Sequence, residues 1–453
     1  MNPESAITDR WNNRALFALL WPLFIEQILA VTMGAADTIM VSSVGEHAVS
    51  GVNIVDQINN LMVIAFIALS TGGGVVVSQF IGRKDYANSR LAAKQLVYCV
   101  TIISLIIMAI AMAFHRPIIR LIYGNIEKDV MDAAATYFFI TSLSYPFLAL
   151  YNSNATLFRA MGDSRTPMLI VLLMNILKIS INVWFIFILQ MGVMGAALST
   201  LICRILASVI TTVMLSRNSE TPISLSGILR IHLIPSMIKN ILNIGIPSGL
   251  ESSMFMIGKL LTQRIFTVFG TTAIAANAIA NVVNSFSFMP GTAFCYALLT
   301  IVGQCIGAGD YAAAKKQTLK IMIISYITLT VISVIIYAAM EPLVCLFNLS
   351  PDTHVMAKSF LRVHCISMAV GWAMSFCLPN SLRAAGDARF VMIGAVVSMW
   401  TVRVSGAYLF TFVLGIGPIG VWLAMGADFI LRGTIYYVRW IGGKWQSKRV
   451  ITN

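Results

Sequence analysis

The chain has 453 residues, of which 58% are hydrophobic and 11% are charged, and its mean hydropathy is +0.84. Soluble domains are roughly half apolar and about a quarter charged, so this composition excludes a soluble globular protein and indicates a membrane protein. A formal net charge of +13 could suggest nucleic-acid binding, so the distribution of the charges has to decide that question.

Apolar segments long enough to cross a bilayer recur along the whole chain. A hydrocarbon core of about 30 Å requires about 20 apolar residues in a helix. Such segments lie near 15–43, 52–78, 92–114, 131–151, 167–189, 193–216, 240–268, 275–303, 320–346, 356–380, 390–414 and 417–440. The alternating pattern of membrane barrels is missing. We predict an all-α membrane protein with twelve transmembrane helices, and no cleavable signal, because Arg10, Trp11 and Arg14 lead directly into the first span.

Basic residues are unevenly distributed between the connecting segments. If both termini lie in the cytoplasm, most lysines and arginines fall in cytoplasmic segments, and the external ones are Arg116, Arg120, Lys128 and Lys358. This is the positive-inside rule, and it explains the net charge without a nucleic-acid partner. We therefore expect a multi-pass protein of the cytoplasmic membrane with both termini in the cytoplasm. The seven cysteines have no paired spacing, so we expect neither disulfides nor a metal site.

The second half of the chain repeats the first. At an offset of 225 residues, Pro22 and Glu26 align with Pro247 and Glu251, VSQFIGRKDYA (77–87) aligns with VGQCIGAGDYA (302–312), and, after a slip of one residue, FRAMGDSR (158–165) aligns with LRAAGDAR (382–389). We predict an N-lobe at 1–220 and a C-lobe at 221–453, two pseudo-symmetric bundles of six helices, with the polar stretch 216–232 as a hinge. An even number of spans gives both copies the same orientation, and the substrate site is expected between them.

The repeated GxDY and RAxGD motifs fall in short basic loops. We interpret them as turns and helix caps, with glycine in the left-handed region. In the first copy we expect Ser164 or Thr166 to cap a helix that has Pro167 in its first turn.

Lys178 lies in the middle of the predicted helix 167–189. An ionised residue there costs roughly 2.5–3.5 kcal/mol, and at about 17 Å from either helix end it cannot fully snorkel to an interface. Asn175, Lys178 and Asn182 share one helix face, so Lys178 is expected to point toward polar partners inside the protein. The candidate partners are the acids of the N-lobe spans, Glu26, Asp37 and Asp56.

Further polar stripes indicate a central cavity. They comprise Asn53, Asp56 and Asn60 in one span, Asn277, Asn281 and Asn284 in another, and Arg403 at the position equivalent to Lys178. We assign to a substrate cavity the residues Glu26, Asp56, Asn175, Glu251, Asn281, Asn284 and Arg403. Hydrogen bonds between packed helices are the alternative explanation of these polar faces.

Several more cations lie in the predicted spans, namely Lys259, Arg264, Arg204 and Arg362. Their number favours some anionic or zwitterionic substrates. The alternative is that acids such as Glu251 and Asp428 neutralise them in salt bridges.

The chain resembles the multidrug and toxic compound extrusion (MATE) family of efflux transporters. The resemblance covers essentially the whole chain and is carried by the two six-span copies, MGAADTIMVSSVG in the first span, the QxxGxxDY and RAxGD loops, and GVMGAALST at the start of the sixth span. It implies two bundles that rock around a central cavity and exchange sodium or protons for organic compounds, which are often cationic drugs.

The resemblance also implies a coupling site in the N-lobe. The family's acidic residue in the first span matches Asp37, and the positions that complete the site in sodium-dependent relatives match Asn182, Thr200 and position 178, where this chain has Lys instead of Asn. We hypothesise that the Lys178 ammonium takes the place of Na⁺ and pairs with Asp37, so that protonation of Asp37 breaks the pair. A permanent salt bridge is the alternative. In the C-lobe, the tenth span has no acid and Glu251 lies about one turn early for a family sodium site.

The sequence thus predicts a monomeric, cation-coupled antiporter for small amphipathic compounds, with H⁺ or Na⁺ as coupling ion and no other cofactor. The first alternative is a flippase or exporter of lipid-linked oligosaccharides or other anionic substrates from the same superfamily. An enzyme is not expected, because HExxH, GxSxG and P-loop motifs are absent from the sequence.

Overall fold

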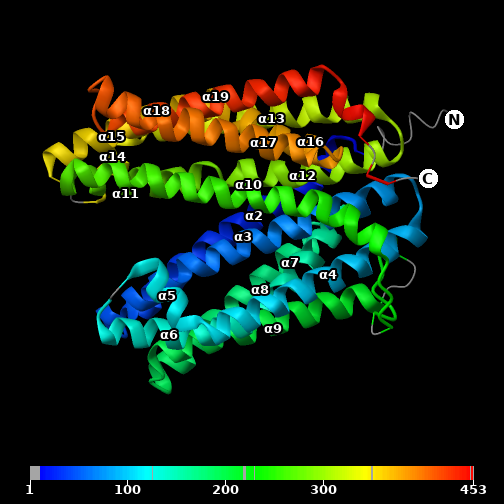
Figure 1. Cartoon of the computed structure of the whole chain (residues 1–453), viewed down its shortest axis with the longest axis horizontal. Coiled ribbons are helices and arrows are strands. Elements are labelled where there is room, and N and C mark those ends of the chain that lie inside the picture. Colours follow the sequence, from blue (N-terminus) through cyan, green and yellow to red (C-terminus); the bar gives the residue numbers. More distant parts are fainter. Residues whose placement is uncertain are drawn as a thin grey trace. The chain divides into compact units, whose positions relative to one another are not determined.

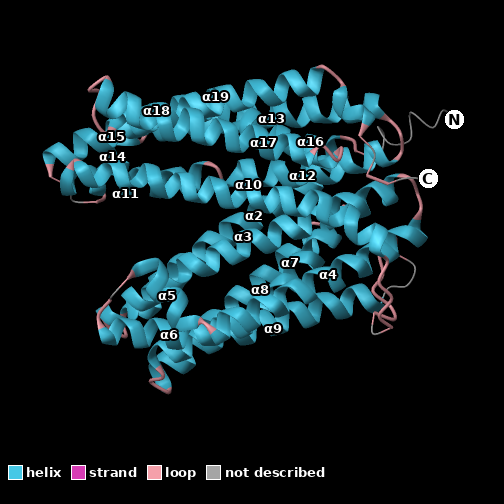
Figure 2. Ribbon diagram, viewed as in Figure 1, coloured by secondary structure: helices cyan, strands magenta, loops and turns pink. Residues whose placement is uncertain are grey.

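The computed structural model describes residues 11–124, 126–217, 221–228, 230–347, 350–448 and 450–451, and their regular structure is entirely helical (Figure 2). The helices of the first half are α2 (Asn13–Ser42), α3 (Glu46–Gly82), α4 (Tyr86–Ala113), α5 (His115–Tyr123), α6 (Lys128–Leu143), α7 (Tyr145–Met161), α8 (Arg165–Asn182), the π-helix η1 (Val183–Ile188) and α9 (Gly192–Arg217). Part of the predicted hinge 216–232 and the chain termini lie outside the described residues.

The helices from residue 235 onward are α10 (Pro235–Val268), α11 (Gly270–Ser287), α12 (Met289–Gly307), α13 (Tyr311–Ala338), α14 (Met340–Cys345), α15 (Pro351–Ser367), η2 (Met368–Cys377), α16 (Leu378–Ala384), α17 (Ala388–Ser398), η3 (Met399–Val404), α18 (Ser405–Tyr408), η4 (Leu409–Val413), α19 (Ile419–Ile441) and η5 (Lys444–Ser447). Of these, η2, η3 and η4 are π-helical and η5 is a 3₁₀ turn. Figure 1 follows the chain from α2 in blue to α19 in red.

The chain folds as two compact units. The N-unit comprises Phe17–Gly249, and the C-unit comprises the described residues up to Leu16 together with those from Leu250 onward. Trp11 belongs to the C-unit, where its carbonyl accepts a hydrogen bond of 3.3 Å from the Gln317 amide. The predicted lobe boundary at residue 220 stays a prediction, because these units report packing whereas the lobes were defined by sequence repetition.

Both units use the same helix pairings, as expected of two copies of one fold. In the N-unit, α6 and α7 each pack against α3 and α9, and α4 packs against α7. In the C-unit, α15 packs against α11 and α19, η2 packs against α12, α13 and α19, and α12 contacts α16. The repeated sequence therefore encodes a repeated packing scheme.

The repeated loops adopt matching turns. Asp85 and Asp310 cap α4 and α13, accepting hydrogen bonds from the backbone nitrogens of Asn88 (3.1 Å) and Ala313 (2.7 Å). The glycines of the two RAxGD motifs both have positive φ, 91° for Gly162 and 88° for Gly386, as predicted for left-handed turn residues.

The capping residue of α8 differs from the predicted one. Ser164 occupies the N-cap position without a capping hydrogen bond. The Asp163 carboxylate instead accepts from the backbone nitrogens of Arg165 (3.0 Å) and Thr166 (3.1 Å), and also from the Thr166 hydroxyl. The prediction of Ser164 or Thr166 was wrong, because a carboxylate in an Asx-type turn is a stronger acceptor than a hydroxyl.

Several predicted continuous spans are interrupted. The span predicted at 131–151 consists of α6 and α7, which meet at Ser144 with a bend of 49°. The π-helical segments η1 to η4 lie inside or at the end of other predicted spans. Among the described residues, nine helices are long and apolar enough to cross a membrane, or ten if the bent pair forms one span. The other two predicted spans correspond to α10 and α19, which carry charged side chains.

Candidate functional site

A polar cluster in the N-unit joins three of the four predicted coupling residues. Lys178 on α8 forms an ion pair with Oδ2 of Asp37 on α2. The Asn182 side-chain amide nitrogen donates a hydrogen bond of 2.9 Å to Oδ1 of the same carboxylate, and the Ser199 hydroxyl on α9 donates to the side-chain oxygen Oδ1 of Asn182. Because α8 presents Lys178 and Asn182 one turn apart on one face, both reach the same acid. Sequence reasoning did not identify Ser199.

The fourth predicted coupling residue, Thr200, lies beside this cluster. Its hydroxyl donates to the Ala196 carbonyl oxygen at 3.0 Å, a bond within its own helix. Thr200 and Asp37 line a small cavity of about 10 Å³, a volume at the limit for one water molecule. Asp56 lines the same cavity and accepts a hydrogen bond of 3.3 Å from the Tyr137 hydroxyl. Asp56, assigned from sequence to the substrate cavity, therefore lies next to the predicted coupling residues.

The two repeats contain matching buried ion pairs. Arg159 pairs with Glu26 in the N-unit, and Nη2 of Arg383 binds both carboxylate oxygens of Glu251, at 2.7 and 2.6 Å, in the C-unit. Each arginine belongs to an RAxGD motif, which sequence reasoning interpreted only as a turn. The signal that could have identified the pairs is their spacing, 133 residues in one copy and 132 in the other.

Asn175 is engaged in helix packing. Its amide donates a hydrogen bond of 2.8 Å to the Leu29 carbonyl oxygen of α2. Neither Asn175 nor Glu26 lines either of the two cavities described for this chain. Their assignment to a substrate cavity therefore stays a prediction.

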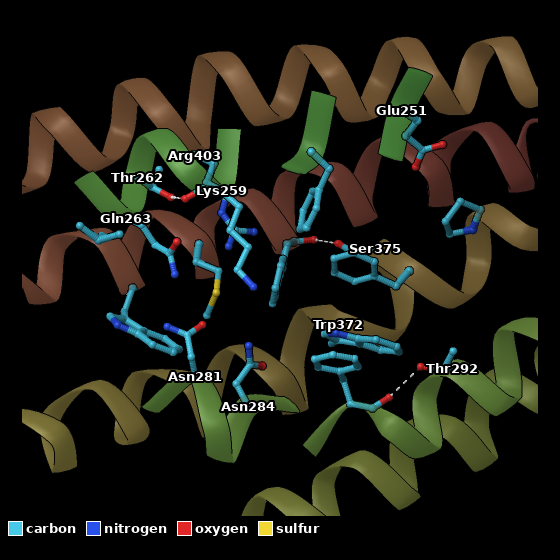
Figure 3. Close-up of a pocket in the computed structure, with 18 of the residues that line it drawn as sticks. Glu251, Lys259, Thr262, Gln263, Asn281, Asn284, Thr292, Trp372, Ser375 and Arg403 are labelled. Atoms are coloured by element: carbon cyan, nitrogen blue, oxygen red, sulfur yellow. Dashed lines mark hydrogen bonds between the residues drawn. The ribbon is translucent and has the colours of Figure 1, made fainter. Parts of the chain in front are cut away.

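The larger of these cavities lies within the C-unit and is named here the C-unit cavity. Its volume is about 380 Å³, in the range of small-molecule sites. Residues of α10, α11, α12, η2, α16, η3 and α19 line it, including the predicted Glu251, Asn281, Asn284 and Arg403. The aromatic part of the wall consists of Phe255, Phe266, Phe288, Trp372, Phe376, Trp422 and Phe429. Figure 3 shows the polar side chains entering from opposite sides of this space.

A buried charge cluster lies at one wall of the C-unit cavity. Arg403 and Arg432 both approach Oδ2 of Asp428, each at 3.7 Å, and the Ser398 hydroxyl donates to Oδ1 at 2.6 Å. The guanidinium carbon of Arg403 is 5.1 Å from the centroid of the Phe255 ring, a cation–π distance. Sequence reasoning identified Asp428 as a neutralising acid but not the second arginine.

A separate polar cluster involves Glu341 and Cys345 of α14 with His354 of α15. Their potential ligand atoms lie within 4.8 Å of one another. Glu341 also pairs with Lys358, and the hydrogen bond from this ammonium lowers the pKa of the Glu341 carboxyl. The ion pair explains the acid's position without a metal.

Comparison with known proteins provides the family context. A family model described as MatE matches residues 22–184 and 246–409, one segment in each repeat. The chain is 30% identical to the "Uncharacterized transporter YisQ" of Bacillus subtilis (strain 168), over 96% of this chain and 95% of that protein. It is 28% identical to the "Probable multidrug resistance protein NorM" of Thermotoga maritima, over 97% and 94% of the two chains.

Solved structures confirm the fold class. The structure described as "MATE in the bent conformation" matches with a TM-score of 0.89 at 18% identity, covering 98% of this chain and 97% of that one. The predicted architecture of twelve transmembrane helices in two pseudo-symmetric bundles agrees with this likeness.

Proposed function

The chain belongs to the MATE family of multi-pass membrane transporters, and on this premise we propose that it is a cation-coupled antiporter that exports small amphipathic organic compounds across the cytoplasmic membrane. Relatives named as multidrug resistance and multidrug export proteins support this substrate class. Transport by alternating access requires no covalent chemistry, so we do not expect an enzyme. These relatives give no support to the oligosaccharide flippase. We expect the antiporter to work as a monomer.

The observation that best supports the proposal is that each carboxylate oxygen of Asp37 has a polar partner. Lys178 occupies one oxygen and Asn182 the other. Protonation would remove the charge that holds Lys178, because a neutral carboxyl attracts an ammonium far less than a carboxylate does. Such a pair responds to one proton by changing contacts between α2 and α8. We expect the exported compound to favour one of the two states, which couples the proton to transport.

Proton coupling is favoured over sodium coupling by the position of Lys178. A sodium ion would have to displace an ammonium from the same oxygen of Asp37, and the adjacent cavity of about 10 Å³ leaves little room for a hydrated ion. We therefore propose H⁺ as the coupling ion, with no other cofactor.

The test uses everted membrane vesicles that carry the full chain. A pH gradient and, separately, a sodium gradient are imposed, and a panel of aromatic compounds of different charge is added while a pH-sensitive dye reports proton release. We expect proton release on addition of exported compounds, and loss of that signal in Asp37→Asn. Export driven by the sodium gradient alone, or normal proton release in Asp37→Asn, would overturn the coupling proposal.

A further inference from the structure

The charges around the C-unit cavity do not balance. Glu251 is the one carboxylate that lines the cavity among the described residues, and Arg383 binds it. Behind the wall, Asp428 is shared by two guanidinium groups, those of Arg403 and Arg432, which leaves one positive charge in excess. Lys259 adds another, because no acid in the described part of the chain forms an ion pair with it.

The unbalanced cations reach the cavity itself. Lys259 and Arg403 both line it, and the side chain of Arg403 is only 9% exposed. Nη1 of Arg403 lies 3.7 Å from Oδ2 of Asp428, a separation too long for a hydrogen bond, so this guanidinium is only weakly held by the acid. Figure 3 shows Lys259 extending into the space toward the side from which Asn281 and Asn284 project. Because no ion pair with Lys259 is formed among the described residues, its ammonium needs a ligand or water in the cavity to solvate it.

The rest of the wall is suited to a flat apolar body. Phe288 stacks on Trp372 with ring planes 14° apart, and Trp372 stacks on Phe376 at 26°. All three rings line the same cavity as Lys259 and Arg403. An aromatic ring bound among them would gain offset or edge contacts, while its charged substituent could reach the cationic wall.

We propose that the C-unit cavity binds aromatic compounds that carry a carboxylate or another anionic group. The anion lies between Lys259 and Arg403 and accepts hydrogen bonds from both, and the ring packs on the aromatic wall. An aromatic cation of equal size would instead meet two like charges in a site of low dielectric constant. As a statement about what is exported, this inference rests on the proposed function and names its substrate class.

The probes are three naphthalene derivatives that differ in charge, 2-naphthoate (anionic), 2-naphthamide (neutral) and 2-naphthylmethylammonium (cationic). Binding to the purified full chain is measured by isothermal titration calorimetry without any ion gradient. We expect 2-naphthoate to bind at least about tenfold more tightly than the other two, since hydrogen bonds between charged partners are the stronger ones. Acetate, which has the charge without the ring, should give no detectable heat.

Variants on α10 distinguish the effect of a positive charge that lines the cavity from that of a positive charge elsewhere on the same helix. Lys259→Gln should weaken 2-naphthoate binding about tenfold and leave 2-naphthamide unchanged, because it removes only the charge-assisted contact. Arg264→Gln removes a cation from the same helix outside the cavity lining and should leave both affinities unchanged. Lys259→Arg should retain 2-naphthoate binding, which shows that a loss in Lys259→Gln reflects charge and not misfolding.

Equal affinities for the three naphthalene probes, or tighter binding of the cationic one, would overturn the proposal. So would a Lys259→Gln variant that binds 2-naphthoate like the unmodified chain. Because no gradient is applied, binding with this pattern remains interpretable if the vesicle experiment shows no ion coupling. The two proposals can therefore fail separately.

Discussion

Single side chains in the membrane-spanning helices differ in whether their charge is compensated. Lys178 has Asp37 as a partner, Glu26 and Glu251 have arginines, and Lys259 has no acid partner within the described residues. A compensated charge can lock a structure or act as a switch, and the ion dependence of transport distinguishes the two. The uncompensated charge needs a ligand or water.

Replacing Lys178 by Asn tests the switch. The variant places an amide where the family resemblance implies Asn in sodium-dependent relatives, and it leaves Asp37 free to bind a cation. We expect proton-driven export to fall and sodium-driven export to appear in the vesicle assay. Lys128→Asn, on an exposed position of α6, is the control and should leave both activities unchanged. Unaltered ion dependence of the Lys178 variant would indicate a permanent salt bridge.

The buried pair of Glu251 and Arg383 should matter for stability far more than an exposed pair. Glu251→Gln leaves a buried guanidinium without its counter-ion, which costs about 3–5 kcal/mol. We expect a clear decrease in the apparent Tm of the purified protein, and a similar one for Glu26→Gln. Asp132→Asn breaks the pair with Arg116, whose side chains are 47% and 50% exposed, and should change Tm little. Equal shifts for buried and exposed pairs would contradict this account.

Residue spacing predicted the features that depend on periodicity and repetition, but not those that depend on distant contacts. The spans, the repeat and the inward direction of Lys178 follow from residue spacing. The choice of Asp37 over Glu26 and Asp56 as its partner does not, because all three acids lie in N-lobe spans; the hypothesis that the partner is Asp37 comes from the family resemblance, and the structure contains this pair. Arg159 and Glu26 are 133 residues apart, so their contact left no local signal.

At the scale of helices and loops, the two repeats form the same turn with different residues. The second residue after α3 is Lys84, with φ at 62°, and the second residue after α12 is its equivalent Gly309, with φ at 79°. A left-handed conformation is unfavourable for a residue with a Cβ atom and free of that cost for glycine. The N-unit therefore carries local strain that the C-unit avoids.

This asymmetry predicts that Lys84→Gly stabilises the protein. We expect a gain of about 0.5–1 kcal/mol, since relief of the left-handed strain is partly offset by the greater flexibility of glycine in the unfolded chain. The reverse change, Gly309→Lys, should lower stability by a similar amount. Apparent Tm values of both variants provide the measurement, and a destabilised Lys84→Gly variant would contradict the strain argument.

The sequence did not reveal that parts of the predicted helices are π-helical. η1 ends the α8 span and η4 ends the α17–α18 span, so both repeats widen the helix at an equivalent place. The residues of these segments are largely apolar, for example VWFIFI in η1, and a regular α-helix would accommodate them equally well. A hydrogen-bond register that depends on tertiary packing cannot be inferred from such a segment alone.

At the scale of the whole molecule, the distribution of basic residues predicts the orientation in the membrane. The helix of the span predicted at 320–346, α13, ends at Ala338, so α14 belongs to the connection that follows it. With both termini in the cytoplasm, this connection faces outward. Cys345 is exposed on α14, whereas Cys99, Cys203, Cys305, Cys365 and Cys377 are buried and Cys295 is intermediate. Cys345 can therefore report on which side of the membrane α14 lies.

We expect a membrane-impermeant maleimide to label intact cells at Cys345. A thiolate must be reached from water to react, so a reagent confined to the outside modifies only a cysteine on that face. Cys345→Ser should abolish the labelling, which shows that the buried cysteines do not contribute. Labelling restricted to everted vesicles would place α14 in the cytoplasm and both termini outside.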